Sequence, residues 1–433
     1  MDTNQDHCLA RRDLLKSSVG GVLGSSLVGW FGRLAHGAES ATESKAKQKK
    51  CILLWMDGGP SHIDTFDPKP DAIADIRGPF DAIDTSVPGI QVSSKFPQMA
   101  RLMQHCAPLR GMSTDEADHG RARIYMHSGY KPGLGGITYP GLGSIVSSEL
   151  GKIDFPLPNF VATGIPLGKY DFLTDPGFLG PQHSALIHAD PSRKLENLQP
   201  IPSAEEFQRR EKLLLDQDRE FLRSFPSAVA ETRQAVVSRA SRLMRAEAAR
   251  AFNLDLEPAA ARDAYGDSTF GRGCLLARRL VECDVPFVEV YLSNWDTHEK
   301  KVAEAAHGLM SVVDQAMSAL IRDLSERGLL DSTLVIWMGE FGRTPRMNRD
   351  GGRDHYSKAW TTLLAGGGIR GGQAIGASDH SGTQVTDRPI SAKDFFATVC
   401  KILNINPARQ FNTPIGRPIT LVDKGAQPVT ELL

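Results

Sequence analysis

The fold of this chain is decided by the stretch Cys51-Ile52-Leu53-Leu54-Trp55-Met56-Asp57-Gly58-Gly59-Pro60. An unbroken apolar run that ends in Asp-Gly-Gly-Pro is typical of a strand buried on both faces of a sheet and entering a loop. Strands of this kind occur in parallel sheets that helices cover on both sides. The stretch therefore predicts the central strand of an α/β domain, with Asp57 at its carboxyl end.

Apolar runs of strand length alternate with amphipathic helical patterns through much of the remaining chain. Ser391 stands directly before the last helical pattern and is a good N-terminal cap. This alternation argues for a mainly parallel sheet with helices on both faces. The expected strands cover residues 51–56, 107–112, 160–163, 286–292, 333–338 and 361–365, and the expected helices cover 119–130, 140–150, 271–283, 302–327 and 392–403.

Residues 203–262 interrupt the alternation with charged, helical sequence. Apolar residues such as Phe207, Leu214 and Phe221 recur there on one stripe. Charged faces around an apolar stripe are typical of packing helices. We therefore expect a helical insertion or cap at 203–262, inside a domain that spans 39–433.

The first 38 residues have the pattern of a twin-arginine (Tat) signal peptide. Arg11-Arg12 precedes a Gly/Ser/Val/Leu run at 17–30, and small residues follow at 35–38. The apolar run is short and interrupted by Gly and Ser, so cleavage is favoured over a stable membrane span. An amphipathic N-terminal helix is the alternative, but it fits the Gly-rich run poorly. The pattern predicts export by the Tat translocase to the periplasm or cell surface.

The charge of the chain does not support nucleic acid or an anionic membrane surface as its main partner. Lys and Arg total 50, Asp and Glu total 51, and the net charge is −1. The cysteines show no CxxC spacing, and Cys51, Cys274 and Cys400 stand in apolar settings. Buried thiols are therefore favoured over a disulfide framework.

Acidic and imidazole groups follow three of the expected strands. Asp57 follows 51–56, Asp296 and His298 follow 286–292, Glu340 follows 333–338, and His355 comes soon afterwards. Since the carboxyl ends of parallel strands border the ligand crevice, these groups can converge on one divalent metal site. The mixture of carboxylate and imidazole favours zinc, whereas a site dominated by carboxylates would favour manganese, calcium or magnesium.

Each of these candidates also has a simpler interpretation. Asp57 could shape a turn, and Asp64 or Asp67 in the same loop could take its role. His355 could be a surface loop residue, and Arg343 could be solvated instead of binding an anion.

Five short motifs occur in this order along the chain: Gly58-Gly59-Pro60-Ser61-His62-Ile63-Asp64-Thr65-Phe66-Asp67-Pro68-Lys69-Pro70, His119-Gly120-Arg121-Ala122, Trp295-Asp296-Thr297-His298, Gly339-Glu340-Phe341-Gly342-Arg343-Thr344-Pro345 and Gly352-Arg353-Asp354-His355. Together they resemble a Tat-exported bacterial family, domain-of-unknown-function family 1501, which is placed in the alkaline phosphatase and sulfatase superfamily. The resemblance covers nearly all of 39–433 and implies an alkaline phosphatase-like fold.

The superfamily resemblance puts His119 where a nucleophile usually stands, ten residues before Gly129. Ser, Thr or Cys is usual there, so His119 could be a phosphorylated nucleophile, a metal ligand or a cap that holds a loop. Arg123 falls where sulfatases carry an arginine, but the cysteine motif that yields formylglycine is absent.

Two further positions depart from the superfamily pattern. Lys300 stands where a histidine normally follows the Asp corresponding to Asp296, so either His298 substitutes for it or the site is altered. Phe341 follows Glu340 where an Asp-His pair is usual. A second metal site would therefore lack one of its usual imidazoles.

These observations predict an exported, metal-dependent hydrolase of phosphate or sulfate esters. Its substrate would be an anionic ester, including sulfated or phosphorylated carbohydrates. A non-catalytic carbohydrate- or envelope-binding protein on the same fold and a phosphoryl or phosphoglycerol transferase are the alternatives. The expected metal ligands are Asp57, Asp296, His298, Glu340 and His355, the expected catalytic residue is His119, and the expected substrate-binding residues are Arg123 and Arg343.

Overall fold

A computed structural model describes residues 48–166, 175–195, 198, 203–225, 228–245, 247–413 and 415–433. The predicted signal peptide, residues 1–38, lies outside these ranges. Lys49–Leu433 form one unit. Among the described residues, no helix has the length and apolar character needed to cross a membrane.

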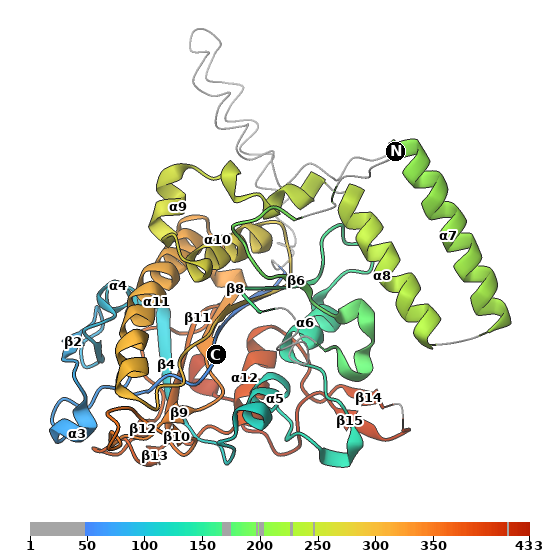
Figure 1. The fold of residues 1–433 in the computed structure, drawn as a ribbon. Coiled ribbons are helices and arrows are strands. Elements are labelled where there is room, and N and C mark those ends of the chain that lie inside the picture. Colours follow the sequence, from blue (N-terminus) through green and yellow to red (C-terminus); the bar gives the residue numbers. More distant parts are fainter. Residues whose placement is uncertain are drawn as a thin grey trace, which may run out of the picture. The chain divides into compact units, whose positions relative to one another are not determined.

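A seven-stranded sheet forms the centre of the fold (Figure 1). Its central strand, β1, pairs in parallel with both neighbours, so that Leu53 lies opposite Glu289 on one side and Ile336 on the other. One strand of the sheet, β11, runs antiparallel to both of its neighbours. The strands lie in the order β4 (Cys106–Met112), β11 (Trp360–Gly366), β8 (Thr333–Met338), β1 (Lys50–Met56), β7 (Phe287–Leu292), β5 (Phe160–Thr163) and β6 (Leu186–His188).

The alternation of side chains along β1 divides the core into two layers. Ile52, Leu54 and Met56 belong to one buried cluster, which also contains residues of α10 (Thr269–Glu282) and α11 (Lys300–Glu326). Cys51, Leu53 and Trp55 belong to the other, which contains residues of α6 (Leu142–Leu150) and α12 (Ala392–Ile402). Successive residues of a strand point to opposite faces, so helices cover both faces of the sheet. The predicted α/β fold class is confirmed.

Shorter elements complete the fold around this sheet. Ser391 caps α12 as predicted, and Asp394 reciprocates in a capping box. The remaining α-helices in the described ranges are α3 (Ala74–Arg77), α4 (Pro97–Ala100), α5 (His119–Ser128), α7 (Ala204–Ser224), α8 (Ala228–Arg245) and α9 (Ala259–Tyr265). The remaining strands form four pairs, β2 (Ala82–Asp84) with β3 (Gln91–Ser93), β9 (Gly342–Arg343) with β10 (His355–Tyr356), β12 (Ala377–Ser378) with β13 (Val385–Asp387), and β14 (Gln410–Asn412) with β15 (Pro418–Thr420).

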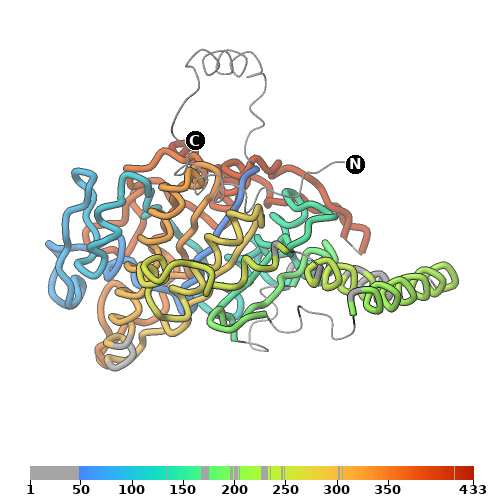
Figure 2. Tube along the Cα trace, turned by 90° about the horizontal axis from the view of Figure 1, so that it is seen from above, coloured from blue at the N-terminus to red at the C-terminus, as the bar shows by residue number. Residues whose placement is uncertain are grey.

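The segment predicted as a helical insertion, 203–262, contains α7, α8 and the start of α9. Helices α7 and α8 lie side by side in both views (Figures 1 and 2). Helix α8 also contacts a short 3₁₀ helix, η6 (Pro181–His183), and the Arg239 guanidinium donates to the carbonyls of Pro181 and Ser184. These bonds attach α8 to the chain that precedes the insertion.

Candidate metal centre

Residues of the candidate site follow three neighbouring strands and lie at one edge of the sheet. Strands β8, β1 and β7 are adjacent and parallel, so their carboxyl ends lie together. Asp57 directly follows β1, Asp296 follows β7, and Glu340 follows β8. The pair β9–β10 then places His355 opposite Arg343. This is the convergence that the positions after the strands predict.

Gly58 allows the loops after β1 and β7 to approach closely. Its φ of +110° lies in a region that residues with a side chain rarely adopt, and a Cβ atom there would be 2.5 Å from the Asp296 backbone nitrogen. The Trp295 N–H donates to the Asp57 carbonyl at 3.1 Å, which fastens the two loops together. Asp296 is thereby held beside the end of the central strand.

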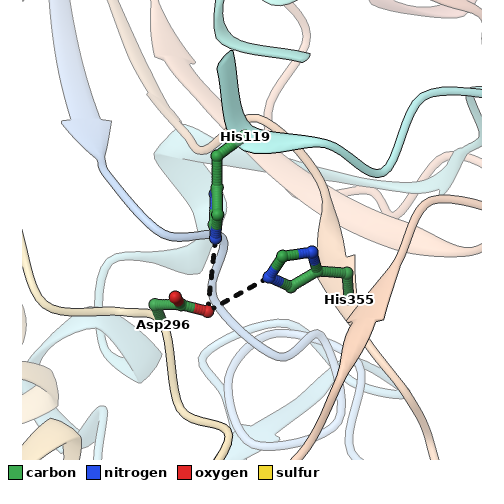
Figure 3. A group of neighbouring side chains, drawn as sticks. All are labelled: His119, Asp296 and His355. Atoms are coloured by element: carbon green, nitrogen blue, oxygen red, sulfur yellow. Dashed lines mark hydrogen bonds and ion pairs between the residues drawn. The ribbon is translucent and has the colours of Figure 1, made fainter. Parts of the chain in front are cut away.

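Three imidazole Nε2 atoms surround one carboxylate oxygen. The Nε2 atoms of His119 and His355 each lie 3.3 Å from Asp296 Oδ1, as Figure 3 shows. The Nε2 atom of His298 lies 3.0 Å from the same oxygen. Ligand atoms of His119, Asp296 and His355 all lie within 4.8 Å of one another, a spacing that could hold a metal ion.

The other ring nitrogen of each histidine contacts an oxygen acceptor. His119 Nδ1 lies 2.6 Å from Glu340 Oε1, His298 Nδ1 lies 2.8 Å from Asp354 Oδ1, and His355 Nδ1 lies 2.8 Å from the Ala117 carbonyl. Such acceptors hold the proton on Nδ1 and leave the Nε2 lone pair free to coordinate. The three rings are thus oriented as metal-ligating histidines usually are.

Two observations test whether a cation fits these residues. The Nε2 atoms of His298 and His355 lie 2.9 Å apart, so two lone pairs would face each other unless a proton or a cation stands between them. Glu340 Oε2 is buried and lacks a hydrogen-bond partner among the described residues. Buried polar atoms without partners call for an ion or water. A divalent cation therefore fits this set of donors.

Charge at the centre is balanced by protonation when no cation is bound. Burial lowers the pKa of His119, but hydrogen bonds to Asp296 and Glu340 outweigh burial and raise this pKa to about 9. Burial raises the pKa of Asp296, but hydrogen bonds from His119, His355 and Arg343 bring it far below its usual range. A cation would therefore have to displace a proton from His119.

Two arginines neutralise the carboxylates around the centre. Arg343 is fully buried and donates from Nη2 to Asp296 Oδ1 at 2.6 Å. Arg123 forms a two-pronged pair with Asp57, with contacts of 2.5 Å and 3.0 Å. Arg123 Nε also lies 3.7 Å from Glu340 Oε1, so its guanidinium stands between the two carboxylates.

All eight predicted site residues lie at or next to the candidate metal centre, but only four of them contribute atoms to it. His119, Asp296, His298 and His355 form the centre itself. The remaining four surround it through the contacts described above. Glu340 orients His119, Arg123 pairs with Asp57, and Arg343 pairs with Asp296.

The sequence did not predict which residue contacts His298. It also did not decide which of the acidic residues after β1 would reach the centre. Asp354 accepts from His298, and its place beside His355 in Gly352-Arg353-Asp354-His355 was the available signal. Asp64 pairs with Arg353. Asp67 pairs with Lys69 and Arg110, so neither alternative to Asp57 reaches the centre.

These features define an α/β protein with a candidate cation site of three imidazoles and one carboxylate at the carboxyl edge of its sheet. The chain belongs to the family described as protein of unknown function (DUF1501), which matches residues 48–433. The family identification made from the five motifs is thus confirmed. No curated protein matches the chain.

Several solved structures are distantly similar to the chain. The lipoteichoic acid synthase LtaP from Listeria monocytogenes is 10% identical, with a TM-score of 0.39 and coverage of 86% of this chain and 78% of that one. The PsFucS1 sulfatase from Pseudoalteromonas sp. is 14% identical, with a TM-score of 0.37 and coverage of 86% and 70%. The phosphonate monoester hydrolase of Agrobacterium radiobacter is 15% identical, with a TM-score of 0.31 and coverage of 88% and 78%.

Proposed function

We propose that the protein is an exported, metal-dependent hydrolase of phosphate or sulfate esters. The observation that carries this proposal is the convergence of three Nε2 atoms on Asp296 Oδ1, each ring being fixed through its Nδ1 atom. Export to the periplasm or cell surface through the Tat translocase rests on the Arg11-Arg12 pattern.

Zinc is the metal that this set of donors favours. His119, His298, His355 and Asp296 would hold it, because imidazole nitrogens with one carboxylate oxygen are common zinc ligands. When bound, a divalent cation here would polarise an ester oxygen and lower the pKa of water. Asp57 and Glu340, also predicted as ligands, support the centre in this proposal, since Arg123 and His119 engage their carboxylates.

Arg123 is the group best placed to bind the anionic part of a substrate. Its side chain is 14% exposed and lies within 4 Å of Glu340, which itself contacts His119. A guanidinium can donate two parallel hydrogen bonds to a phosphate or sulfate group. The first turn of α5 is less suited, because the Asp118 side chain already accepts from the Arg121 backbone N–H. Arg343, the other predicted anion-binding residue, is fully buried, and we propose that it positions Asp296.

His119 is better suited to hold a metal than to attack an ester. Its Nε2 atom faces Asp296 Oδ1 at the same distance as His355 Nε2. Its Nδ1 atom is engaged by Glu340, so neither nitrogen is directed away from the centre. We therefore infer that His119 is a ligand, and that activated water attacks the ester in place of a covalent nucleophile.

The position of His119 also favours a second candidate, a non-catalytic protein that binds an anionic carbohydrate or envelope component. A hydroxyl or thiol nucleophile would be expected there in a superfamily hydrolase, and the chain has an imidazole. The transferase alternative needs the same centre and differs only in using an alcohol acceptor.

Turnover of a panel of aryl phosphates and aryl sulfates, with and without EDTA, separates these functions. The hydrolase proposal predicts turnover that EDTA removes and zinc restores. His355→Ala should abolish turnover, while His380→Ala, a change at an exposed histidine, should not affect it. Phosphoglycerol formed on addition of glycerol would identify a transferase. Zinc-loaded protein that leaves the whole panel intact would contradict the hydrolase proposal and support binding without catalysis.

A further inference from the structure

A cavity lies at the opposite edge of the sheet from the candidate metal centre. It has a volume of about 490 Å³ and is formed by the end of α6, the loop that enters β5, the helix η6 and one face of α8. Asn159, which lines it, directly precedes β5, whereas the candidate metal centre follows the carboxyl ends of strands parallel to β5. The two sites are therefore separate.

The described residues that line this cavity carry only positive charge. They include Lys152, Arg239 and Arg242, and none of them is an Asp or a Glu. The single acidic residue of α6, Glu149, is bonded to Arg409. Within the described part of the chain, Arg239 and Arg242 form no ion pair.

Arg239 and Arg242, both on α8, are placed so that their charge is not compensated by a described carboxylate. Among the described residues, Arg239 donates only to the backbone carbonyls of Pro181 and Ser184, and burial together with the nearby Arg242 lowers its pKa. Arg242 Nε is buried and has no hydrogen-bond partner among the described residues. A buried guanidinium donor without an acceptor is costly unless a ligand supplies one.

The remaining lining of the cavity combines apolar side chains, such as Phe155 and Leu157, with hydrogen-bonding groups of the kind that contact sugars. Ser147 Oγ contacts His183 Nδ1 at 3.1 Å on one wall. A single sulfate or phosphate ion is much smaller than this cavity, so a larger polar molecule would be needed to fill it. The uncharged polar side chains of the lining are Ser147, Ser148, Asn159, Gln182, Gln234 and Ser238.

We propose that this cavity binds the sulfate or phosphate group of a saccharide, with the group held between Arg239 and Arg242. The site would retain charged carbohydrate without taking part in chemistry at the metal centre, and it does not depend on the function proposed above. Inorganic sulfate or phosphate presents the same oxygen atoms as the esterified group, so the affinities for the free ion and for the charged saccharide have to be compared.

Binding is measured by calorimetry on the purified protein with sodium sulfate, sodium phosphate, a sulfated disaccharide and the same disaccharide without sulfate, at constant ionic strength. The expected result is saturable binding of the charged ligands, at least tenfold tighter for the sulfated disaccharide than for inorganic sulfate, and none for the uncharged sugar. Equal affinity for inorganic sulfate and the sulfated disaccharide would overturn the saccharide assignment.

Three variants locate the binding. Arg242→Gln should lose it, and its melting temperature without ligand should be unchanged or higher, because removal of Arg242 relieves repulsion with Arg239. Arg233→Gln, a change on the same helix at an arginine that pairs with Asp218, should bind like the unmodified protein. His355→Ala should also retain binding. Undiminished binding by Arg242→Gln, or its loss in His355→Ala alone, would overturn the proposal.

Discussion

Glu340 Oε1 lies 2.6 Å from His119 Nδ1, and this contact joins the loop after β8 to the first residue of α5. The two residues are 221 positions apart in the chain. A carboxylate that accepts from the Nδ1 atom of a histidine fixes both the tautomer and the ring plane, and it makes Nε2 a better ligand. Glu340 therefore acts on the centre through His119 in our account.

Replacement of Glu340 by Gln should weaken metal binding without removing it. The amide cannot supply the charge that favours the Nδ1-protonated imidazole, and loss of such a partner typically costs 10- to 100-fold in affinity. Competition with a chromophoric zinc chelator measures this change. Glu431→Gln, at a carboxylate that pairs with Arg388 far along the chain, should leave affinity unchanged. Equal affinity in Glu340→Gln and the unmodified protein would show that the contact has no such role.

The Arg123–Asp57 pair should contribute to stability as a unit. Both side chains are largely buried, at 14% and 6% exposure, so removal of one partner leaves the other charge poorly solvated. Asp57→Asn and Arg123→Gln should each lower the free energy of unfolding by about 3 kcal/mol. The double variant should lose clearly less than the sum of the two. Urea unfolding of the four proteins measures this coupling.

Metal content separates a pairing role of Asp57 from a ligand role. In our account Asp57→Asn retains its zinc, since four other donors surround the centre. Loss of zinc from Asp57→Asn under conditions where the protein remains folded would make Asp57 a ligand, as its position after the first strand predicted.

The buried His62 should make stability depend on pH. Burial lowers its pKa to about 4, and Asp67 and the bond to the Gly382 carbonyl oppose this only partly. The ring is therefore neutral in the folded protein at pH values where the unfolded chain, with a pKa near 6.5, already binds a proton. The contribution of the neutral, buried His62 ring to the free energy of unfolding is fully present above about pH 6.5. It is lost as the pH falls toward 4, by up to roughly 3 kcal/mol.

Unfolding in urea at pH 7 and pH 5, with EDTA present, tests this dependence. The unmodified protein should lose more stability between the two pH values than His62→Gln does. An equal loss in both proteins would assign the pH dependence to other groups.

The central sheet could be predicted because its strands are buried on both faces. The run Cys51–Met56 is apolar throughout, and the structure extends it by only one residue, to Lys50. Residues 160–163 and 333–338 match their observed strands fully. The antiparallel pairing of β11 could not be predicted, because the sequence of a buried strand such as Trp360–Gly366 does not indicate whether it pairs in parallel or antiparallel.

The candidate site could be predicted as a set of residues but not as an arrangement. A polar residue after a parallel strand is certain to lie at the ligand edge, which located Asp57, Asp296 and Glu340. The pairing of Arg123 with Asp57 depends on where α5 crosses that edge, and sequence spacing does not contain this information. The role of Asp354 depends in the same way on the loop between β9 and β10.

Elemental analysis of the purified protein, before and after substitution of His355, measures whether the three imidazoles and Asp296 bind zinc. We expect one zinc ion bound per chain after incubation with zinc and gel filtration. We also expect loss of that zinc in folded His355→Ala but not in His380→Ala. Protein that is free of bound metal after this treatment, or His355→Ala that binds zinc as tightly as the unmodified protein, would contradict the account.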